Sequence, residues 1–194
     1  MNSHVSIETD KELYPMLNIN KTALVIIDVQ EKLSRVMCEK EKLFENLQKL
    51  IKGVKLLNIP VMVTEQNPNG LGLTVPDIAP LLVGIKPITK FSFSCCSEEL
   101  FMRGIEYLKR KQILLAGIET HVCVYQTAID LIEAGYEVHT VIDCVSSRTL
   151  ENKNLALDKM KSEGSKLTSV EIALFELLRT AKSPLFKEMS QIVK

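Results

Sequence analysis

The sequence predicts an α/β fold, a three-layer α/β/α sandwich with a six-stranded, mostly parallel, doubly wound sheet. Short apolar runs of strand length alternate along the chain with longer segments in which apolar residues recur at helical spacing. The short runs are apolar throughout, as expected of parallel strands that are covered on both faces. A length of 194 residues and a hydrophobic content of 46% suffice for one domain with a full core.

The first half of the chain supplies three strands and two helices. In chain order these are a strand at residues 23–28, a helix over 41–57, a strand at 60–64, a strand at 86–90 and a helix over 98–109. The first strand–helix–strand run makes a βαβ unit. Residues 65–84 are rich in proline and glycine, and a loop of this length within a compact domain is usually functional. We expect Ser97 to be the N-cap of the second helix.

The second half continues the alternation. It contains a strand at 113–115, a helix from 120 through 131, a strand at 137–142, a helix over 151–163, a strand at 166–167, a helix ending near 179 and a terminal helix over 186–193. Gly117 is expected to end the first of these strands, and Gly135 to close the helix that follows. Residues 143–149 are predicted to form a loop, and Thr168 and Glu171 a capping box.

Charge and cysteine usage exclude several classes of protein. The 24 basic and 24 acidic side chains cancel and form no long block, so we expect neither nucleic acid nor a membrane surface as a partner. No apolar run approaches the ~20 residues that span a bilayer, and the N-terminus lacks a secretory hydrophobic region. Five cysteines, without a CxxC pair, suit free thiols in a reducing cytosol. A cytoplasmic location is therefore predicted.

Residues 1–20 read as an irregular N-terminal arm that precedes the domain. Such an arm could pack on a neighbouring copy of the chain. We expect a homo-oligomer, a dimer or larger.

Cys123 occupies the position around which the chain is organised. It lies in the first turn of a predicted helix, just past the carboxyl end of a buried strand, where open α/β sheets bind ligands. The positive end of the helix dipole favours a thiolate there, which predicts a lowered pKa for the thiol. The layout is that of a nucleophile elbow, although the GxSxG motif is absent. The alternative is that Cys123 is a small buried hydrophobic residue.

Two further ionisable groups end predicted strands. Asp28 closes the apolar run of the first strand, and Lys90 closes the third. Because parallel strands end at one edge of a sheet, both can converge with Cys123, and together they supply a base, a cation that stabilises a thiolate, and a nucleophile. The alternatives are a loop aspartate that caps the next element and a surface lysine.

Three segments carry a resemblance to a known family. ALVIIDVQ, ITKFSFS and LLAGIETHVCVYQTAIDLIEAGYEV resemble the isochorismatase-like cysteine hydrolases, which include nicotinamidases, carbamoylsarcosine amidases and isochorismatases. The resemblance covers the chain from about residue 20, so residues 21–194 are interpreted as one isochorismatase-like hydrolase domain. TEQNPNGLGLTVP, VIDCVSSRT and SPLFKE look closer still to the isochorismatase-domain-containing proteins of eukaryotes and their bacterial relatives, whose substrates are largely unassigned.

The resemblance implies a role for each matching residue. Asp28 would act as general base, Lys90 would orient and support the site, and Cys123 would attack the substrate. The bond between Ile118 and Glu119 matches the non-proline cis peptide of the family. It would turn the Glu119 N–H towards the site, where this N–H and that of Cys123 would form an oxyanion hole.

Further residues are candidates for the substrate pocket. These are Gln30, Glu65, Phe91, Phe93, Thr120 and Tyr125. The aromatic members lie beside predicted core elements, and plain packing is the alternative for them.

Two departures from the family pattern bear on cofactors and chemistry. Metal-binding nicotinamidases carry an aspartate and two histidines in the region equivalent to 65–84, which has no histidine here. Of the three histidines only His121 is near the site, so we expect no metal and no other cofactor. True isochorismatases cleave a vinyl ether and lack the nucleophilic cysteine, so Cys123 favours amide or ester chemistry.

The predicted function is therefore hydrolysis of an amide-like C–N bond in a small molecule, through a thioester on Cys123. One alternative is a binding protein on the same fold, with Cys123 as a redox-sensing thiol. Another is acid–base hydrolysis of isochorismate driven by Asp28. That reaction would survive Cys123→Ala, whereas the covalent route would not.

Overall fold

A single six-stranded sheet runs through the protein. The computed structural model describes residues 16–194, and the strand order is β3-β2-β1-β4-β5-β6 with every pairing parallel. The strands are β1 Thr22–Ile27, β2 Val61–Gln66, β3 Ile88–Lys90, β4 Gln112–Ile118, β5 Glu137–Ser146 and β6 Lys166–Thr168. The predicted α/β fold class is confirmed, and the sheet is parallel throughout.

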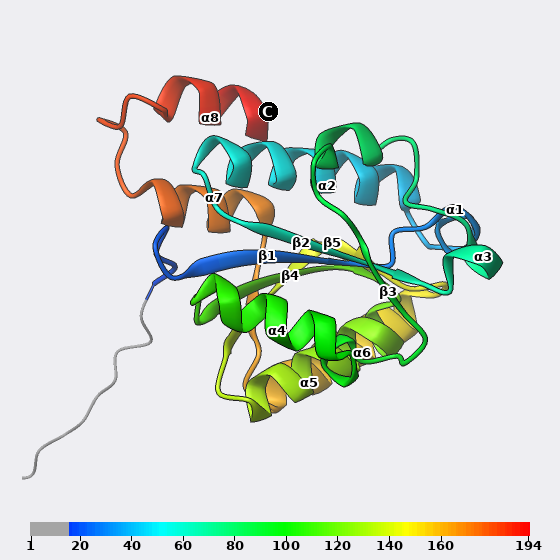
Figure 1. The fold of residues 1–194 in the computed structure, drawn as a ribbon. Coiled ribbons are helices and arrows are strands. Elements are labelled where there is room, and N and C mark those ends of the chain that lie inside the picture. Colours follow the sequence, from blue (N-terminus) through cyan, green and yellow to red (C-terminus); the bar gives the residue numbers. More distant parts are fainter. Residues whose placement is uncertain (1–15) are drawn as a thin grey trace, which may run out of the picture.

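Helices cover both faces of this sheet. The α-helices are α1 Glu31–Ser34, α2 Lys40–Leu56, α3 Pro68–Leu71, α4 Glu99–Leu108, α5 Tyr125–Glu133, α6 Leu150–Ser162, α7 Val170–Leu178 and α8 Phe186–Val193. Shorter turns are the 3₁₀ helices η1 Ala79–Leu82 and η2 Cys95–Ser97 and the π-helical turn η3 Thr120–Val124. Helices α2, α7 and α8 lie on one face, and α4, α5 and α6 lie on the other (Figure 1).

The core consists of two apolar layers, one on each side of the sheet. Leu24 and Ile26 of β1 point into the layer beneath α2 and α7. Val25 and Ile27 of the same strand point into the layer beneath α4 and α5. Both sets are fully buried, which is why β1 is apolar at successive positions.

The order of the strands places a switch point between β1 and β4. From β1 the chain builds β2 and β3 on one side and then crosses to build β4, β5 and β6 on the other. Ligands of open α/β sheets bind outside the carboxyl ends of strands at such a point. Asp28 follows β1 and Cys123 follows β4, so the fold carries both to this crevice.

Gly117 was predicted to end its strand, but it lies within β4. It pairs with Ile27 of β1 and has φ +121°, a conformation that favours glycine. A Cβ atom at this position would overlap the backbone of Ile27. The glycine therefore allows β1 and β4 to approach closely beside Asp28.

Other predicted boundaries also need correction. Strand β5 continues to Ser146 rather than ending at 142, and its pairing with β4 shifts register between Leu115 and Gly117. Helix α4 follows Glu98 at its N-cap position, so the predicted Ser97 cap is wrong. Helix α7 is capped by Ser169, whose hydroxyl accepts a hydrogen bond from the Ile172 N–H, in place of the predicted capping box one residue earlier.

The predicted N-terminal arm is described only in part, because residues 1–15 lie outside the described residues. Leu17 is buried, and its N–H donates to the Glu176 carboxylate at 2.7 Å. The Asn18 N–H donates to the Gln112 side chain at 2.8 Å. Residues 16–20 thus pack on the domain of their own chain.

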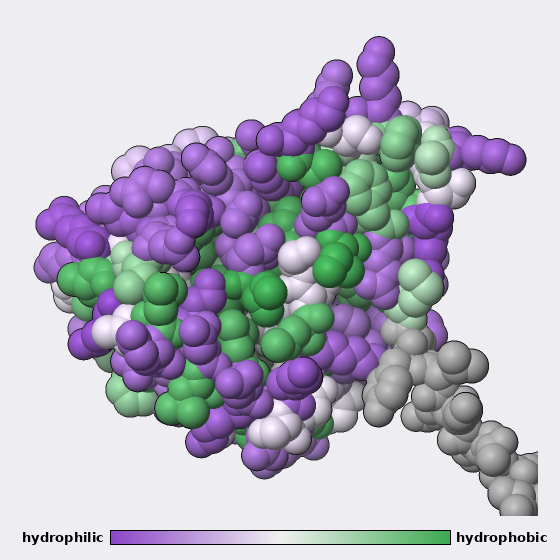
Figure 2. Space-filling view, turned by 180° about the vertical axis from the view of Figure 1, so that it is seen from behind, coloured by the Kyte–Doolittle hydropathy of each residue, from purple (hydrophilic) through white to green (hydrophobic). Residues whose placement is uncertain are grey.

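The outer surface mixes polar and apolar groups. On the side opposite to that of Figure 1, apolar side chains lie scattered among polar ones (Figure 2). Across residues 16–194, none of the helices has the length and apolar character needed to cross a bilayer.

Candidate active site

Asp28 lies at the carboxyl end of β1 and is fully buried. Its φ of +52° is left-handed, a region that aspartate and asparagine enter more readily than most residues. The Thr64 hydroxyl of β2 donates to Asp28 Oδ1 at 2.7 Å. Asp28 Oδ2 lies 2.6 Å from Lys90 Nζ. Both carboxylate oxygens are therefore engaged, Oδ1 by a hydrogen bond from β2 and Oδ2 by an ion pair with β3.

Lys90 is buried completely, with none of its side chain exposed, so it is not the surface lysine of the alternative interpretation. Besides its ion pair with Asp28, its ammonium donates to Gln66 Oε1 at 2.7 Å. It also donates to the carbonyl oxygens of Ser92 and Phe93, at 3.1 Å each. Three hydrogen-bond acceptors and one counter-ion hold the ammonium in one position, and a buried charge requires partners of this kind.

Cys123 lies in the π-helical turn η3 that joins β4 to α5, and only 6% of the residue is exposed. Its thiol interacts with the Asp28 carboxylate, and the charge of Lys90 also acts on it. The structure thus brings Asp28, Lys90 and Cys123 together, from the ends of three different strands.

The predicted lowering of the Cys123 pKa is wrong. Burial raises the pKa of the Cys123 thiol to about 12, and the negative charge of Asp28 acts in the same direction, against Lys90. A helix N-terminus predicts the opposite when considered alone. Because desolvation and a neighbouring carboxylate outweigh it, the resting sulfur carries its proton near neutral pH.

The pKa shifts of Asp28 and Lys90 point to different charge states of the pair. A raised pKa favours a neutral carboxyl at Asp28 but a charged ammonium at Lys90. Burial raises the pKa of Asp28 above 3.8, although Lys90 and Thr64 act to lower it. Burial acts to lower the pKa of Lys90, but the charge and hydrogen bond of Asp28, together with the other groups around the ammonium, outweigh burial and raise that pKa above 10.5. We regard the ionised pair as the resting state, since neutral Asp28 would leave the ammonium buried without a counter-ion.

The peptide between Ile118 and Glu119 is cis and leads from β4 into the nucleophile turn. The Glu119 side chain is buried and accepts hydrogen bonds from Arg148, which lies between β5 and α6. Sequence reasoning placed Arg148 in a loop but gave it no role.

Two of the predicted pocket residues hold the backbone. Gln30 is buried, and its amide nitrogen donates to the carbonyl oxygens of Gln66 and Gly72, at 3.0 and 2.6 Å. Its oxygen accepts from the Gln66 N–H at 2.7 Å. Glu65 accepts from both the N–H and the hydroxyl of Thr74, at 2.7 Å each. Both side chains thereby fix the segment that follows β2.

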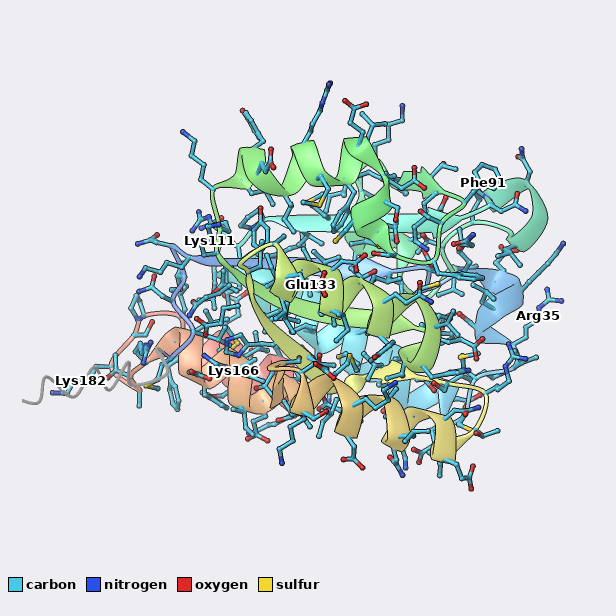
Figure 3. All side chains as sticks on the ribbon, turned by 90° about the horizontal axis from the view of Figure 1, so that it is seen from below. Arg35, Phe91, Lys111, Glu133, Lys166 and Lys182 are labelled. Atoms are coloured by element: carbon cyan, nitrogen blue, oxygen red, sulfur yellow. The ribbon has the colours of Figure 1, made fainter. Side chains whose placement is uncertain are left out.

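The remaining pocket candidates differ in their exposure. Thr120 is buried beside the nucleophile turn, and its hydroxyl has no hydrogen-bond partner within residues 16–194. Phe91 and Phe93 are 72% and 55% exposed, so neither is a core residue. Phe91 lies at the end of the molecule where the strands terminate, opposite Lys111 (Figure 3). Tyr125 is half-buried beneath Lys159, whose Nζ is 4.9 Å from the ring centre.

Asp28, Lys90 and Cys123 have little contact with solvent. Five surface cavities have volumes of about 200 to 310 Å³, and none of these five is lined by Asp28, Lys90 or Cys123. One is lined by Glu65 of β2 and by Leu73 and Thr74 on the segment that follows this strand. The 6% of Cys123 that is exposed is therefore the surface by which this residue meets solvent.

Sequence reasoning missed two polar residues that support the site, Thr64 and Gln66. Thr64 holds Asp28, and Gln66 holds Lys90. The available signal was their position, because both lie at the end of an apolar run adjacent in the sheet to that of Asp28. Cys95 adds a buried thiol behind them, with Sγ donating to Thr64 Oγ1 at 3.8 Å.

Within the described part of the chain, no group of three or more His, Cys, Asp or Glu side chains is arranged to hold a metal ion. His121, the histidine nearest the site, is hydrogen-bonded through Nδ1 to Ser147 Oγ at 3.0 Å.

Comparison with known proteins decides the family. The isochorismatase domain matches residues 22–172. The chain belongs to the isochorismatase domain family. Its fold is therefore the hydrolase fold of that family, and the resemblance found in the sequence is confirmed.

Relatives are similar over almost the whole chain. The secreted isochorismatase effector Isc1 of Phytophthora sojae is 38% identical over 90% of this chain and 85% of its own length. The isochorismatase domain-containing protein 2 of Danio rerio is 37% identical over 91% of this chain and 89% of its own.

Solved structures agree with this assignment. The MAR1 ribonuclease of Caenorhabditis elegans has a TM-score of 0.87 and 36% identity, covering 92% of each chain. The YcaC gene product of Escherichia coli, described as an octameric hydrolase of unknown specificity, has a TM-score of 0.88 over 92% of this chain and 89% of its own. At 24% identity the second comparison shows the fold alone.

Proposed function

We propose that this family member is a cysteine hydrolase that cleaves an amide-like C–N bond of a small molecule. The observation that carries the proposal is the convergence of three buried groups: the Asp28 carboxylate, the Lys90 ammonium at 2.6 Å, and the Cys123 thiol. A thiol beside an ionised carboxylate has a base within reach. Such a pair is the arrangement of an activated nucleophile.

The first half of the reaction forms a thioester. Asp28 accepts the proton of Cys123 as the sulfur attacks the carbonyl carbon, and the carbonyl electron pair moves onto oxygen. The Glu119 and Cys123 N–H groups would stabilise that oxyanion. When the C–N bond breaks, Asp28 returns the proton to the nitrogen, and ammonia or another amine leaves.

The second half regenerates the enzyme. Asp28, again ionised, accepts a proton from a water molecule whose oxygen attacks the thioester carbon. Collapse of the second oxyanion breaks the C–S bond, the sulfur recovers a proton from Asp28, and a carboxylic acid leaves. Lys90 remains charged throughout and keeps Asp28 in position. No metal or other cofactor is required by these steps.

A raised thiol pKa fits this route. A sulfur that stays protonated at rest needs a base during attack, and Asp28 is that base. The burial of the three groups favours a small substrate, and a cytoplasmic location is proposed with it.

The test compares acyl release from a panel of small amides by wild type, Cys123→Ala and Cys96→Ala. Cys96 provides a matched cysteine control because it is half-buried and lies outside the triad. Hydrolysis should persist in Cys96→Ala and fall to background in Cys123→Ala. Turnover that survives Cys123→Ala would falsify the covalent mechanism.

The same three proteins separate the rival functions. Isochorismate hydrolysis retained in Cys123→Ala would indicate acid–base cleavage by Asp28. RNA is included because one similar structure is that of a ribonuclease. Cleavage of RNA without any acyl release would replace our proposal, which includes no nucleic acid partner.

Self-association is the remaining part of the proposed assembly. We expect a homo-oligomer, a dimer or larger, because the structurally similar YcaC gene product is described as an octamer. Sedimentation velocity across a range of protein concentrations measures the mass in solution. A monomer at every concentration would contradict this expectation.

A further inference from the structure

An ion pair between exposed Arg148 and buried Glu119 holds the nucleophile turn from outside the triad. Arg148 Nη2 lies 2.7 Å from Glu119 Oε1, and Arg148 Nε donates to Oε2 at 3.1 Å. The Arg148 backbone N–H donates to the same Oε2 at 3.2 Å. The arrangement is the two-point fork that an arginine forms with a carboxylate. It fixes both the position and the rotation of the Glu119 side chain.

Exposure differs sharply between the two partners. The Glu119 side chain is 7% exposed, whereas that of Arg148 is 60% exposed. Burial acts to raise the pKa of Glu119, but the hydrogen bonds and charge of Arg148 outweigh it and hold that pKa below its usual value. A nearly buried carboxylate therefore depends on one arginine for its charge partner.

The segment that carries Arg148 is itself held on its other side. The Cys38 N–H donates to the Ser147 carbonyl oxygen at 2.9 Å, and the Cys38 thiol donates to the Arg148 carbonyl oxygen at 3.1 Å. Ser147 Oγ also meets His121 Nδ1 at 3.0 Å. The turn that contains Cys123 is thus joined at two points to a segment that is anchored elsewhere.

We propose that Arg148 is a positioning residue for acyl transfer, which acts by holding Glu119 so that the backbone N–H of this residue stays directed at the oxyanion. The inference rests on the proposed function, because it concerns the oxyanion hole of the same site. Arg148 does not touch the reacting atoms. Its contribution is the geometry of a donor that must be fixed before the negative charge develops.

Loss of the guanidinium leaves the Glu119 carboxylate buried without a counter-ion, with only the backbone N–H of residue 148 as its hydrogen-bond donor. Such a group turns towards solvent or takes up a proton, and either change releases the side chain that fixes this peptide. The Asp28–Lys90–Cys123 contacts involve other atoms and persist. Arg148 should therefore affect reactions that form an oxyanion, and spare those that do not.

Two reagents make this distinction at Cys123. p-Nitrophenyl acetate acylates a thiol through a tetrahedral oxyanion, forming the C–S bond and releasing p-nitrophenolate. Iodoacetamide alkylates the same sulfur by displacement of iodide, and no oxyanion forms. Both rates are read at Cys123 itself by quenching and peptide mass mapping. The quantity compared is the ratio of acylation to alkylation.

The variants are Arg148→Ala and Arg148→Lys, with Arg103→Ala as control. Arg103 forms an exposed ion pair with Glu99 one helical turn away on α4, so its loss removes a comparable surface pair. For Arg148→Ala we expect the ratio to fall by about tenfold to a hundredfold, somewhat less than deletion of an oxyanion donor. Arg148→Lys keeps the positive charge but cannot form the two-point fork, so its ratio should lie between those of wild type and Arg148→Ala. Added guanidinium, below denaturing concentrations, should restore the ratio in Arg148→Ala alone.

Each outcome bears on the inference. An unchanged ratio in folded Arg148→Ala, or an equal loss of acylation and alkylation, overturns it. Failure of both Arg148 variants to fold also overturns it, because the pair would then be structural. If wild-type Cys123 is alkylated but never acylated, the proposed function fails together with the inference. If wild type is acylated and the ratio stays constant, only the inference fails.

Discussion

At the scale of single residues, the chemistry depends on where one proton resides. Burial and Asp28 keep it on the sulfur of Cys123, whose pKa is raised to about 12. Asp28 in turn remains ionised through Lys90 and Thr64. Asp28 and Cys123 therefore form a general base beside a protonated thiol, and not a preformed thiolate.

Asp28→Asn should separate thiol ionisation from catalysis. Asparagine has the same shape and tolerates the left-handed φ of this position. Removing the carboxylate lowers the Cys123 pKa, because Asp28 raises it and Lys90 would then act alone. Alkylation of Cys123 near neutral pH should accelerate while hydrolysis falls by about 10²- to 10⁴-fold.

The measurement for Asp28→Asn is the pH dependence of Cys123 alkylation, read by peptide mapping, beside acyl release. Asp143→Asn is the matched control, because Asp143 also lies towards the end of a strand but hydrogen-bonds the Val170 N–H instead. An alkylation profile that moves to higher pH in Asp28→Asn would contradict the assignment of the proton.

Thr64→Val should shift the acid limb of the pH–rate profile. The Thr64 hydroxyl stabilises ionised Asp28, so its loss raises the Asp28 pKa further above 3.8. Since Asp28 must be ionised to accept a proton, kcat/KM should fall at low pH and recover at higher pH. A hydrogen bond to a charged group is worth ~1.5–3 kcal/mol, which predicts a shift of about one pH unit or more.

Two further variants check the Thr64 result. Thr64→Ser keeps the hydroxyl and should restore the wild-type limb. Thr140→Val removes another buried threonine hydroxyl, which contacts Ser165 on the far strands. A loss of activity in Thr64→Val that is the same at every pH would point to misfolding instead of proton control.

At the scale of elements, the site depends on the approach of β1 to β4. Asp28 follows directly on Ile27, which pairs with Gly117. The pleat leaves no space for a side chain between them. The positions of the base and of the nucleophile turn are therefore coupled through one glycine.

Gly117→Ala should destabilise the fold and impair catalysis together. Its Cβ would overlap Ile27 backbone atoms, which cannot move without displacing Asp28. We expect a loss of about 3 kcal/mol in the free energy of unfolding, the upper part of the range for overpacking. Urea denaturation measures it. Gly84→Ala is the control, since Gly84 shares a positive φ of +86° but has open space around it.

If Gly117→Ala lost no more stability than Gly84→Ala, the close approach of the two strands would not be the reason for the glycine. Catalytic loss without any loss of stability would also point to a different role.

At the scale of the whole molecule, the sheet order gathers strand ends that are far apart in the chain. Asp28, Lys90 and Cys123 come from the first, third and fourth strands. All three residues are buried. The Asp28–Lys90 ion pair is the charged centre of the site, and residues 16–194 offer no set of metal ligands.

Purified protein should contain no stoichiometric transition metal. The Asp28 carboxylate is neutralised by Lys90 and is not free to bind a cation. Elemental analysis by mass spectrometry, with and without prior chelation, measures the content. Activity should be unchanged by chelation. One zinc or iron per chain, with activity lost on its removal, would overturn this.

The sequence alone determined the strands, most helices and the three ionisable residues of the site. Continuous apolar runs identify buried parallel strands, and the polar residue that ends such a run must lie at the sheet edge. Asp28 and Lys90 were found in this way, and Cys123 by its place in the first turn of the helix that follows such a run. These properties are local, or follow from strand direction, so a linear pattern contains them.

Only the tertiary structure decided how these residues are charged and held. The helix dipole is a local effect and predicted a lowered pKa for Cys123, whereas desolvation and the Asp28 carboxylate, which come from packing, raise it. Gln30 and Glu65 were assigned to the pocket, and the structure shows their side chains bonded to the backbone of Gly72 and Thr74. The Arg148–Glu119 clamp joins residues 29 positions apart. Through-space partners and burial exist only once the chain has folded, because both depend on which strands become neighbours.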